Sequence, residues 1–357
     1  MHIEKYSPTE KASWDAFVEA SKNGTFLFRR DYMDYHADRF CDHSLMIYSD
    51  RHRLLALLPA NISGQQLYSH QGLTYGGLIL GTDARADDVL QIFQDIIAYL
   101  RALGITAWHY KQMPTIYHRC PAEEDEYALW RCGAQLETCL ISTTIPLTGT
   151  LLPATERRRR RGMKRAMAAG LTIRYDAPLN DFWPIMVSNL MQRYGLSPVH
   201  TLDEMTLLQQ RFPQNIRCHT VCDASGTALA GCVLYDCNDR VIHIQYGHAT
   251  PEGKALGALD MLYLTLIDDY RKGTSRAAIS TISPISQISP ISPIGQISQI
   301  SQISPISQIS LISPHAFFDF GNSNEDGGHL LNHDLIAQKE GFGGRGIAYK
   351  TYLISIQ

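Results

Sequence analysis

The chain of 357 residues repeats one order of helices and strands, and this repetition constrains its fold more than any other feature. Apolar residues at helical spacing, strand-like apolar runs and turn residues delimit the elements of the first half. They are two helices, four short strands, a long helix, a strand, a helix and a strand, predicted over Glu10–Ser21, Arg30–Asp38, Ser44–Tyr48, Leu54–Ala60, Leu67–His70, Gly77–Leu80, Ala86–Leu103, Ile105–Lys111, Ala122–Arg131 and Gln135–Pro146.

The second half follows the same order after one short strand. Its elements are predicted over Leu171–Tyr175, Asp181–Tyr194, Leu202–Arg211, Ile216–Cys222, Ala228–Asp236, Val241–His248, Pro251–Arg271, Phe317–Phe320, Leu330–Gly341 and Gly346–Ile354. The length also favours two compact units over one. We therefore expect an N-terminal α+β domain over 1–148, a basic linker helix over 149–170 and a C-terminal α+β domain over 171–357.

A tract of twelve Ile-Ser-x triplets interrupts the second half over Ile279–Pro314, with Gly295 in one Ser position. It follows the last long helix, where the first half needs only a turn at Gly104, so we expect a surface insertion. Ser and Pro at a period of three favour an extended low-complexity linker. A two-coil β-solenoid and a strap that binds a partner are the alternatives; regular Pro opposes strand pairing in the former.

Composition excludes several classes of protein. Lys and Arg (32) nearly balance Asp and Glu (35), which argues against a DNA-coating protein. The eight cysteines contain no C-x2-C pair and the fourteen histidines no H-E-x-x-H motif, so no metal site is expected. With neither a secretory signal nor a membrane-spanning stretch predicted, we expect a cytoplasmic protein with no integral membrane segment.

Two segments of the second half carry the most specific signal, FFDFG at 317–321 and QKEGFGG at 338–344. They resemble the C-terminal signature of Fem-type transferases and related tandem-GNAT acyl-CoA N-acyltransferases, and the order of elements in each half is that of the GNAT fold. The resemblance implies two tandem GNAT-like domains of mixed α/β structure. It also implies transfer of an acyl or aminoacyl group to an amine, often on a cell-envelope sugar, lipid or peptidoglycan precursor.

Physical chemistry suggests roles for residues of this signature. Lys339, one turn before a glycine-rich loop, can place an ammonium over a phosphate or over the oxyanion of acyl transfer. Gly343, Gly344 and Arg345 of that loop are predicted to bind the donor. Asp319, at the end of a strand, is either a base for the attacking amine or the group that holds the following loop.

Coenzyme A is an expected but unproven co-substrate. GNAT enzymes cradle its pyrophosphate at the start of the long helix, where free amides suit an anion. Lys254 and Gly257 have the spacing of that loop, whereas Leu259 and Glu252 depart from it. The match is therefore degraded.

Other residues are candidates for binding the acceptor. Tyr75, Gly76 and Gly77 form a glycine-rich bend that could line a cleft between the domains. Tyr246, in the last strand of the second meander, is a further candidate. The loop after Asp319 contributes Ser323 and Glu325, with Asn324 between them.

The run Arg157–Arg161, followed by Lys164 and Arg165, predicts a basic helix between the two halves. Five consecutive arginines cover every face of a helix. Arg157 and Arg161 are predicted to grip a phosphorylated acceptor, or tRNA, because Arg offers paired donors to phosphate. The alternative is a solvated linker helix with a few salt bridges.

Together these observations predict an N-acyltransferase that needs no enzyme nucleophile, since the sequence contains no G-x-S-x-G elbow. Acyl-CoA is the favoured donor, and a small-molecule or precursor-linked amine is the acceptor. Two alternatives remain: a Fem-like ligase that uses aminoacyl-tRNA, and a catalytically silent GNAT-fold protein that binds a phosphorylated glycan. The degraded pyrophosphate loop keeps the latter open.

Overall fold

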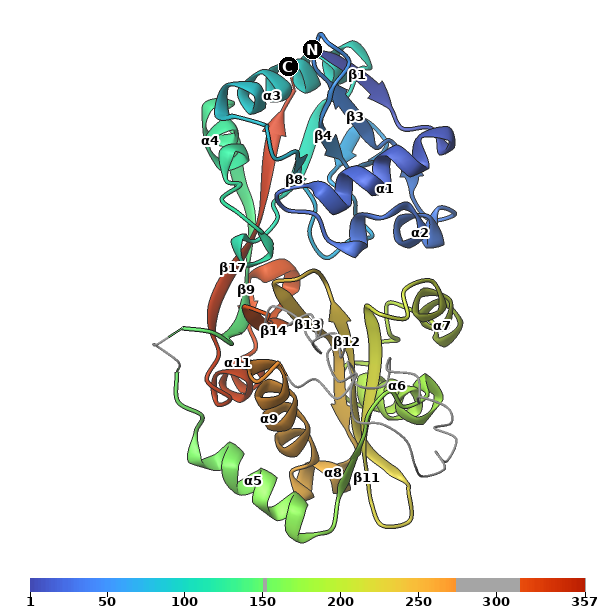
Figure 1. Ribbon diagram of the computed structural model, residues 1–357, viewed down its shortest axis with the longest axis vertical. Coiled ribbons are helices and arrows are strands. Elements are labelled where there is room, and N and C mark those ends of the chain that lie inside the picture. Colours follow the sequence, from blue (N-terminus) through green and yellow to red (C-terminus); the bar gives the residue numbers. More distant parts are fainter. Residues whose placement is uncertain (150–152, 274–314, 357) are drawn as a thin grey trace, which may run out of the picture.

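A computed structural model describes residues 1–149, 153–273 and 315–356 of the chain. The helices and strands form two lobes that stack along the long axis of the molecule, with both chain ends in the upper lobe (Figure 1). The Ile-Ser-x tract lies outside the described residues. None of the described helices is long and apolar enough to cross a membrane.

The upper lobe, here the N-lobe, is built from the elements between residues 2 and 131. Its helices α1, α2, α3 and α4 span Lys11–Ala20, Arg30–Met33, Ala86–Ala102 and Glu124–Arg131. Its strands β1 to β8 span His2–Lys5, Cys41–Asp42, Leu45–Tyr48, Leu54–Leu58, Asn61–Ser63, Gln66–Tyr68, Ile79–Leu80 and Ala107–Lys111. Helix α3 buries one apolar stripe, made by Val89, Ile92, Phe93, Ile96 and Leu100.

The lower lobe, here the C-lobe, holds the elements between residues 157 and 340. Its helices α5, α6, α7, α8, α9 and α11 span Arg157–Ala168, Leu179–Tyr194, Leu202–Arg211, Pro251–Leu256, Ala258–Arg271 and His333–Glu340. Its strands β10 to β16 span Thr172–Arg174, Ile216–Cys222, Ala228–Asp236, Val241–Ala249, Phe317–Asn322, Asn324–Glu325 and Leu330–Leu331. Four elements keep their predicted bounds: α7, β11, β12 and β9 (Gln135–Pro146).

One sheet runs through both lobes because their last strands are exchanged. Eleven strands pair in the order β10-β11-β12-β13-β14-β9-β17-β8-β6-β5-β2. Strand β9 comes from the N-lobe sequence but pairs with β14 of the C-lobe. Strand β17 (Arg345–Ser355) comes from the C-lobe sequence but pairs with β8 of the N-lobe through Thr351–Ser355. Each lobe is therefore completed by a strand of the other half (Figure 1).

Three apolar clusters stabilise this arrangement. One lies within the N-lobe around Trp108 and Phe93, and one within the C-lobe around Phe318 and Leu262. The third joins the lobes, and there Phe26 packs against residues of the opposite lobe, Phe212 and Tyr235. The lobes are thus held together by a shared core in addition to the exchanged strands.

Several predicted helices differ from the structure in their bounds; the helix expected over Arg30–Asp38, for example, ends at Met33. Two of the differences have a clear physical cause. The long helix expected over Pro251–Arg271 is divided at Gly257, whose φ of 81° is left-handed. A Cβ there would lie 2.5 Å from the Gly162 carbonyl oxygen of α5, so glycine allows the two helices to touch. The helix expected from Leu330 begins at His333 instead, because Asn332 caps it and Leu330–Leu331 pair with β15.

Candidate active site

The site lies where two parallel strands of the C-lobe separate. Strands β13 and β14 pair only between Val241–His243 and Phe317–Asp319. Beyond them β13 continues to Ala249 while its other edge stays paired with β12. Val233 and Leu234 are consecutive on β12, but they pair with Tyr246 and Ile244 on β13. Gln245, between those two partners, is therefore a β-bulge residue. The free edge of β13 therefore faces the gap with no strand beside it in the described part of the chain.

The gap is the largest of the described pockets, a cavity of about 970 Å³ that we call the wedge cavity. Its lining comes from β13, β14, α6, α9 and α11, with Thr74 of the N-lobe and Tyr349 of β17. Among the lining residues that the structure describes, none is acidic and three are Lys or Arg: Arg193, Lys254 and Lys339. The cavity is thus suited to an anionic ligand.

The wall on the α9 side is mainly aromatic. Phe320 and Phe342 lie with ring centroids 5.4 Å apart, and Tyr263 packs edge-on against both. A side chain at Gly247 would overlap the Tyr263 hydroxyl, so glycine lets that hydroxyl approach the backbone of β13. This wall combines an apolar surface with one phenolic donor.

Beneath the cavity lies Asp319, a fully buried carboxylate. Its Oδ1 accepts hydrogen bonds from Ser142 Oγ (2.6 Å) and Thr144 Oγ1 (2.8 Å), both on the exchanged strand β9. Its Oδ2 accepts from Tyr349 Oη (2.8 Å), Tyr117 Oη (3.1 Å) and His243 Nδ1 (2.8 Å). Burial alone would raise the pKa of Asp319, but these bonds and the adjacent imidazole hold it below its usual value.

His243 links this buried carboxylate to the cavity. It stands at the last paired position of β13, opposite Asp319, and is only 7% exposed. The second ring nitrogen has no hydrogen-bond partner among the described residues. A Cβ at Gly321, where φ is 74°, would lie 3.3 Å from His243 Cε1, so glycine keeps the edge of the ring uncovered.

Lys339 comes from α11 and is also buried against the cavity. Its Nζ donates to the carbonyl oxygens of Gly321 (2.9 Å) and Asn322 (2.6 Å). Burial lowers the pKa of Lys339 to about 8, opposed by the charge of Asp319. Because an ammonium has three N–H groups, one remains for a ligand.

The other end of the cavity holds a second basic group. Lys254 Nζ donates to Asn189 Oδ1 (2.7 Å), and Arg193 and His248 line the same region. Burial, together with the charges of Lys254 and Arg193, lowers the pKa of His248 to about 4. Lys254 and Arg193 can neutralise a phosphate or carboxylate.

The start of α8 offers few backbone amides to that anion. Pro251 has no N–H, Gly253 N is bonded to the Thr250 hydroxyl, and Lys254 N to the Thr250 carbonyl. Gly257 packs against α5 and does not line the cavity. Of the two residues predicted from the pyrophosphate loop, only Lys254 faces the wedge cavity.

The glycine-rich loop after Lys339 is packed against other parts of the chain. The amides of Phe342 and Gly343 are bonded to the carbonyls of Lys339 and Glu340. A Cβ at Gly343 would lie 2.8 Å from the Pro153 carbonyl, and one at Gly344 would overlap Thr143. Arg345 is exposed and bonds the Gly344 carbonyl. The described lining of the cavity includes none of Gly343, Gly344 and Arg345.

The predicted acceptor residues are divided between the cavity and the core. Tyr246 lines the cavity, with its hydroxyl 2.6 Å from His200 Nδ1. Tyr75, Gly76 and Gly77 are buried in the N-lobe, where Tyr75 Oη donates to Thr25. The adjacent Thr74 is exposed and lines the cavity instead.

The chain after Asp319 lines the cavity through Asn322 and then leaves it. Ser323 is buried and its amide is bonded to the Ile141 carbonyl. Glu325 is exposed and accepts a hydrogen bond from Asn332 Nδ2 (2.6 Å). Both residues lie outside the described lining of the wedge cavity.

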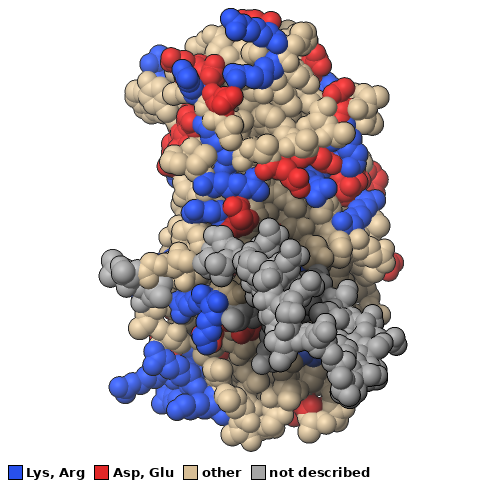
Figure 2. Space-filling view, viewed as in Figure 1, with Lys and Arg blue, Asp and Glu red and all other residues tan. Residues whose placement is uncertain are grey.

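The basic helix α5 packs behind the aromatic wall. Arg159 pairs with Asp260 of α9 (2.6 Å) and lies 5.3 Å from the centroid of the Phe342 ring. Arg157 and Arg161 are exposed on the outside and do not line the cavity. Figure 2 shows Lys and Arg side chains gathered where α5 lies. Arg159 therefore anchors α5 to the C-lobe, whereas Arg157 and Arg161 belong to an exposed basic surface.

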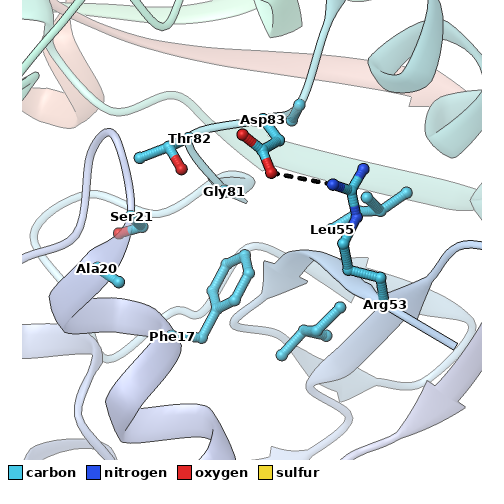
Figure 3. A pocket seen from close by; sticks show the side chains of 10 residues that line it. Phe17, Ala20, Ser21, Arg53, Leu55, Gly81, Thr82 and Asp83 are labelled. Atoms are coloured by element: carbon cyan, nitrogen blue, oxygen red, sulfur yellow. Dashed lines mark hydrogen bonds and ion pairs between the residues drawn. The ribbon is translucent and has the colours of Figure 1, made fainter.

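A smaller pocket of about 110 Å³ lies in the N-lobe between α1 and the strand pair β4–β7 (Figure 3). The exposed ion pair between Arg53 and Asp83 (2.9 Å) crosses it. Phe17 and Leu55 form much of the remaining lining. Its two charged groups therefore satisfy each other. Among the described residues, no His, Cys, Asp and Glu cluster has the geometry of a metal site.

Several site residues were missed by sequence reasoning. His243 lies inside the apolar run VIHIQYG and reads as part of a strand. Ser142, Thr144, Tyr117 and Tyr349 contact Asp319 from far along the chain. Ser142 and Thr144 arrive on the exchanged strand β9, Tyr349 on β17, and Tyr117 from the turn 115–117 of the N-lobe. No local sequence pattern indicates that these segments meet.

Comparison with known proteins supports the architecture. No protein-family model matches the chain, and no curated protein matches it by sequence. Among solved structures, FemX has a TM-score of 0.63 at 11% identity and covers 99% of this chain and 97% of its own. L-PGS from Bacillus licheniformis has a TM-score of 0.56 at 14% identity, covering 99% and 93%. A tandem GNAT protein from the clavulanic acid biosynthesis pathway has a TM-score of 0.50 at 9% identity, and the match covers 100% of this chain and 98% of that protein.

The fold is that of tandem-GNAT and Fem-type proteins. The predicted class, mixed α/β with two GNAT-like units, is confirmed at this level. In each lobe the order of elements agrees with that assignment. At these identities the comparisons establish the fold, and the chemistry has to be argued from the wedge cavity itself.

Proposed function

We propose that the protein is an acyltransferase that forms an amide between an acyl donor and an amine acceptor in the wedge cavity. The observation that carries this proposal is the free edge of β13 in a cavity of about 970 Å³ that also contains the buried Lys339. Backbone N–H groups and an ammonium, fixed before the reaction begins, are the groups that stabilise the oxyanion of acyl transfer. Likeness of fold to FemX and to the tandem GNAT protein supports the same class of reaction.

In this proposal the donor carbonyl lies against the bulge at Gln245, and its oxygen accepts a hydrogen bond from the β13 backbone. The aromatic wall of Phe320 and Phe342 contacts the acyl group. The third N–H of Lys339 contributes positive charge from the β14 side. No step needs an enzyme nucleophile, because the acceptor amine attacks the donor carbonyl directly.

The donor is proposed to carry phosphate, because the described lining of the cavity is cationic and lacks carboxylates. Acyl-CoA and aminoacyl-tRNA both satisfy this condition. Acyl-CoA would be held by the side chains of Lys254 and Arg193, since α8 offers few amides to a pyrophosphate.

The shortage of amides at α8 favours a second candidate, a Fem-like ligase that uses aminoacyl-tRNA. Exposed Arg157 and Arg161 on α5 would then contact the tRNA backbone, outside the cavity. For either donor, the acceptor is proposed to be an amine on a cell-envelope sugar or peptidoglycan-type precursor that enters past Thr74 and Tyr246. Both donors are cytoplasmic compounds, so the proposal places the protein there.

A transfer assay tests the proposal. The purified protein is incubated with acetyl-CoA, or with a panel of aminoacyl-tRNAs, and with amino sugars, UDP-linked precursors and lysine-containing peptides as acceptors. Amide formation is followed by mass spectrometry. The Lys339→Ala variant should lower kcat at least tenfold, about 1.4 kcal/mol of transition-state stabilisation. Tight binding of a phosphorylated glycan without transfer from any donor would instead indicate the silent binding protein.

Lys339→Arg serves as the matched control for that variant. It keeps the positive charge but cannot place a single N–H between the two carbonyls in the same way. Activity intermediate between wild type and Lys339→Ala would support a role for the ammonium itself. Equal kcat values in all three proteins would contradict it.

A further inference from the structure

His243 connects the buried carboxylate of Asp319 with the wedge cavity, which gives it a role beyond packing. Its Nδ1 lies 2.8 Å from Asp319 Oδ2, and its ring lines the cavity beside Gly321. We propose that His243 accepts the proton released by the attacking amine and that Asp319 is its positioning residue. The inference rests on the proposed acyl transfer and names the base that this transfer requires.

The surroundings of Asp319 determine which nitrogen of His243 is available. Every described neighbour of the carboxylate is a hydrogen-bond donor, including the hydroxyls of Ser142, Thr144 and Tyr349. The carboxylate is therefore ionised and can only accept, so Nδ1 of the imidazole must carry the hydrogen it shares. Neutral His243 then presents the lone pair of Nε2, the nitrogen that has no partner among the described residues.

Other groups around the cavity are poorer bases. No Asp or Glu belongs to its described lining. Lys339 uses two N–H groups to hold carbonyl oxygens, and burial keeps the pKa of Tyr349 well above 10. Tyr246 is bonded to His200, and its pKa is raised to about 12 by burial. His248 lies at the opposite end, beside Lys254 and Arg193.

The position of His243 lies between the proposed sites of the donor and the acceptor. Ile244 and Phe320 belong to the C-lobe core on the α9 side. Asp319, the partner of His243, instead accepts hydrogen bonds from Tyr117 and Tyr349 of the shared core. An acyl donor on the α9 side and an amine on the other would therefore meet at the divergence of β13 and β14. His243 lies at that point.

The step balances without any further reactant. The nitrogen of a neutral amine forms a bond to the donor carbonyl carbon, and the carbonyl electrons move to oxygen. His243 Nε2 takes one proton from the resulting ammonium nitrogen. When the intermediate collapses, the bond from carbon to the sulfur or oxygen leaving group breaks, and the proton passes to that group. The products are the amide and a free thiol or hydroxyl, and His243 is neutral again.

His243→Gln and His243→Ala test the base directly. Both should lower kcat by about a hundredfold, the usual contribution of general-base catalysis, with KM for either substrate changed by less than about threefold. Added imidazole should restore part of the activity of His243→Ala, because the deleted ring lines the cavity. His315→Gln is the matched control: His315 pairs with Asp236 (3.0 Å) in the same lobe and lies outside the described lining.

Asp319→Asn tests the positioning role by a measurement that needs no substrate. In ¹⁵N-histidine-labelled protein, the His243 signals, assigned by their loss in His243→Gln, should report hydrogen on Nδ1 and a bare Nε2. In Asp319→Asn this tautomer should no longer be favoured, and kcat should fall at least tenfold with little change in KM.

The outcomes separate the two proposals. Transfer by the wild type together with full activity in His243→Gln, or hydrogen on Nε2 in the wild-type spectrum, overturns the role of His243 and leaves the acyltransferase standing. No transfer by the wild type with any donor overturns both. Transfer that depends on His243 and is partly rescued by imidazole supports both.

Discussion

Each lobe contains a parallel strand pair leading to an exchanged strand, but only the C-lobe leaves that pair open. In the C-lobe, β13 and β14 separate after His243, and the wedge cavity lies between them. In the N-lobe, β6 and β8 pair over Gln66–Tyr68, and the chain after β6 turns back over β8. Ser69 N and Gly76 N bond the carbonyls of His109 and Lys111. The corresponding gap of the N-lobe is therefore filled by its own chain.

The filling loop of the N-lobe is packed as a core. Leu78 N donates to Tyr110 Oη (2.8 Å), and a Cβ at Gly77 would lie 2.8 Å from the same oxygen, so only glycine fits there. Tyr75 packs against Tyr117 with ring centroids 4.4 Å apart. The glycines at 76 and 77, which the sequence suggested as a ligand loop, thus allow close packing in the structure.

Each lobe also contains a buried carboxylate, and the two differ in their hydrogen-bond partners and in the direction of their pKa shift. Asp125 of the N-lobe accepts from Tyr110 Oη (2.7 Å) and has no histidine beside it, and burial raises its pKa to about 6. Asp319 of the C-lobe has a histidine and several hydroxyl partners, which lower its pKa despite burial. The closed N-lobe therefore contains a buried acid whose pKa is raised, and the open C-lobe contains one whose pKa is lowered. The difference teaches that two similar fold units can differ in openness and in the charge state they favour at a buried carboxylate, and the proposed reaction is assigned to the open C-lobe.

The largest effect is expected from filling the wedge cavity of the C-lobe, as the chain itself fills the corresponding gap of the N-lobe. Gln338→Trp places an indole in the wedge cavity from α11, where Gln338 is half-buried. Transfer activity should fall at least a hundredfold, about 2.7 kcal/mol. Gln91→Trp, on the exposed face of α3 in the N-lobe, is the control and should keep wild-type activity. Full activity of Gln338→Trp, measured in folded protein, would place the reaction elsewhere.

A second effect concerns the two carboxylates. Asp319→Asn should lower the free energy of unfolding by about 3–5 kcal/mol, because an amide cannot accept from all the donors around it. Asp125→Asn should change that free energy by less than about 1 kcal/mol at pH 7, because burial already disfavours the carboxylate charge that the amide removes. Urea unfolding of the three proteins measures both values. Similar losses in the two variants would contradict the distinction between the lobes.

A smaller effect is expected from the pH dependence of stability at His70 in the N-lobe. His70 is buried, and desolvation with the nearby charges of His36 and Arg30 lowers its pKa from 6.5 to about 3. The unfolded chain therefore binds a proton that the folded chain does not, so stability is full above about pH 6.5 and falls as the pH is lowered toward 3. His70→Gln should reduce the slope of unfolding free energy between pH 6 and 4 by about 1.4 kcal/mol per pH unit. An unchanged slope would show that His70 is protonated in the folded protein.

The smallest effect distinguishes two neighbours in the N-lobe loop. Thr74 lines the cavity, whereas Tyr75 is buried and bonded to Thr25. Thr74→Val should raise the acceptor KM about two- to fivefold if its hydroxyl contacts the acceptor. Tyr75→Phe should leave KM unchanged and lower stability by about 1 kcal/mol. The reverse pattern would favour Tyr75 as the acceptor contact.

Much of the fold could be predicted because its signals are local. The apolar alternation of β11 and β12 and the Thr201–Glu204 capping box at the start of α7 fix those elements within a few residues. Lys339 and Asp319 belong to a recognisable segment, and both lie at the wedge cavity or directly beneath it. Local patterns were sufficient for these features.

The rest depends on contacts between distant parts of the chain. Tyr117 reaches Asp319 across 202 positions, and Ser142 across 177. Periodicity assigns β9 and β17 as strands but contains no information on which lobe they complete. The division at Gly257 arises from contact with α5, so the helical pattern through 251–271 gave no sign of it. His243 was missed because one polar residue in an apolar strand is usually structural.

Hydrogen–deuterium exchange with a bound donor analogue tests the central claim most directly. The probes are a thioether analogue of acetyl-CoA and a non-hydrolysable 3′-aminoacyl-adenosine, each at saturating concentration with the full-length protein. We predict slower exchange for one of them in β13 over 244–249 and in the α11 segment around Lys339, with no change over 66–80 of the N-lobe. Protection of 66–80 without protection of 244–249 would contradict the assignment of the active site to the C-lobe.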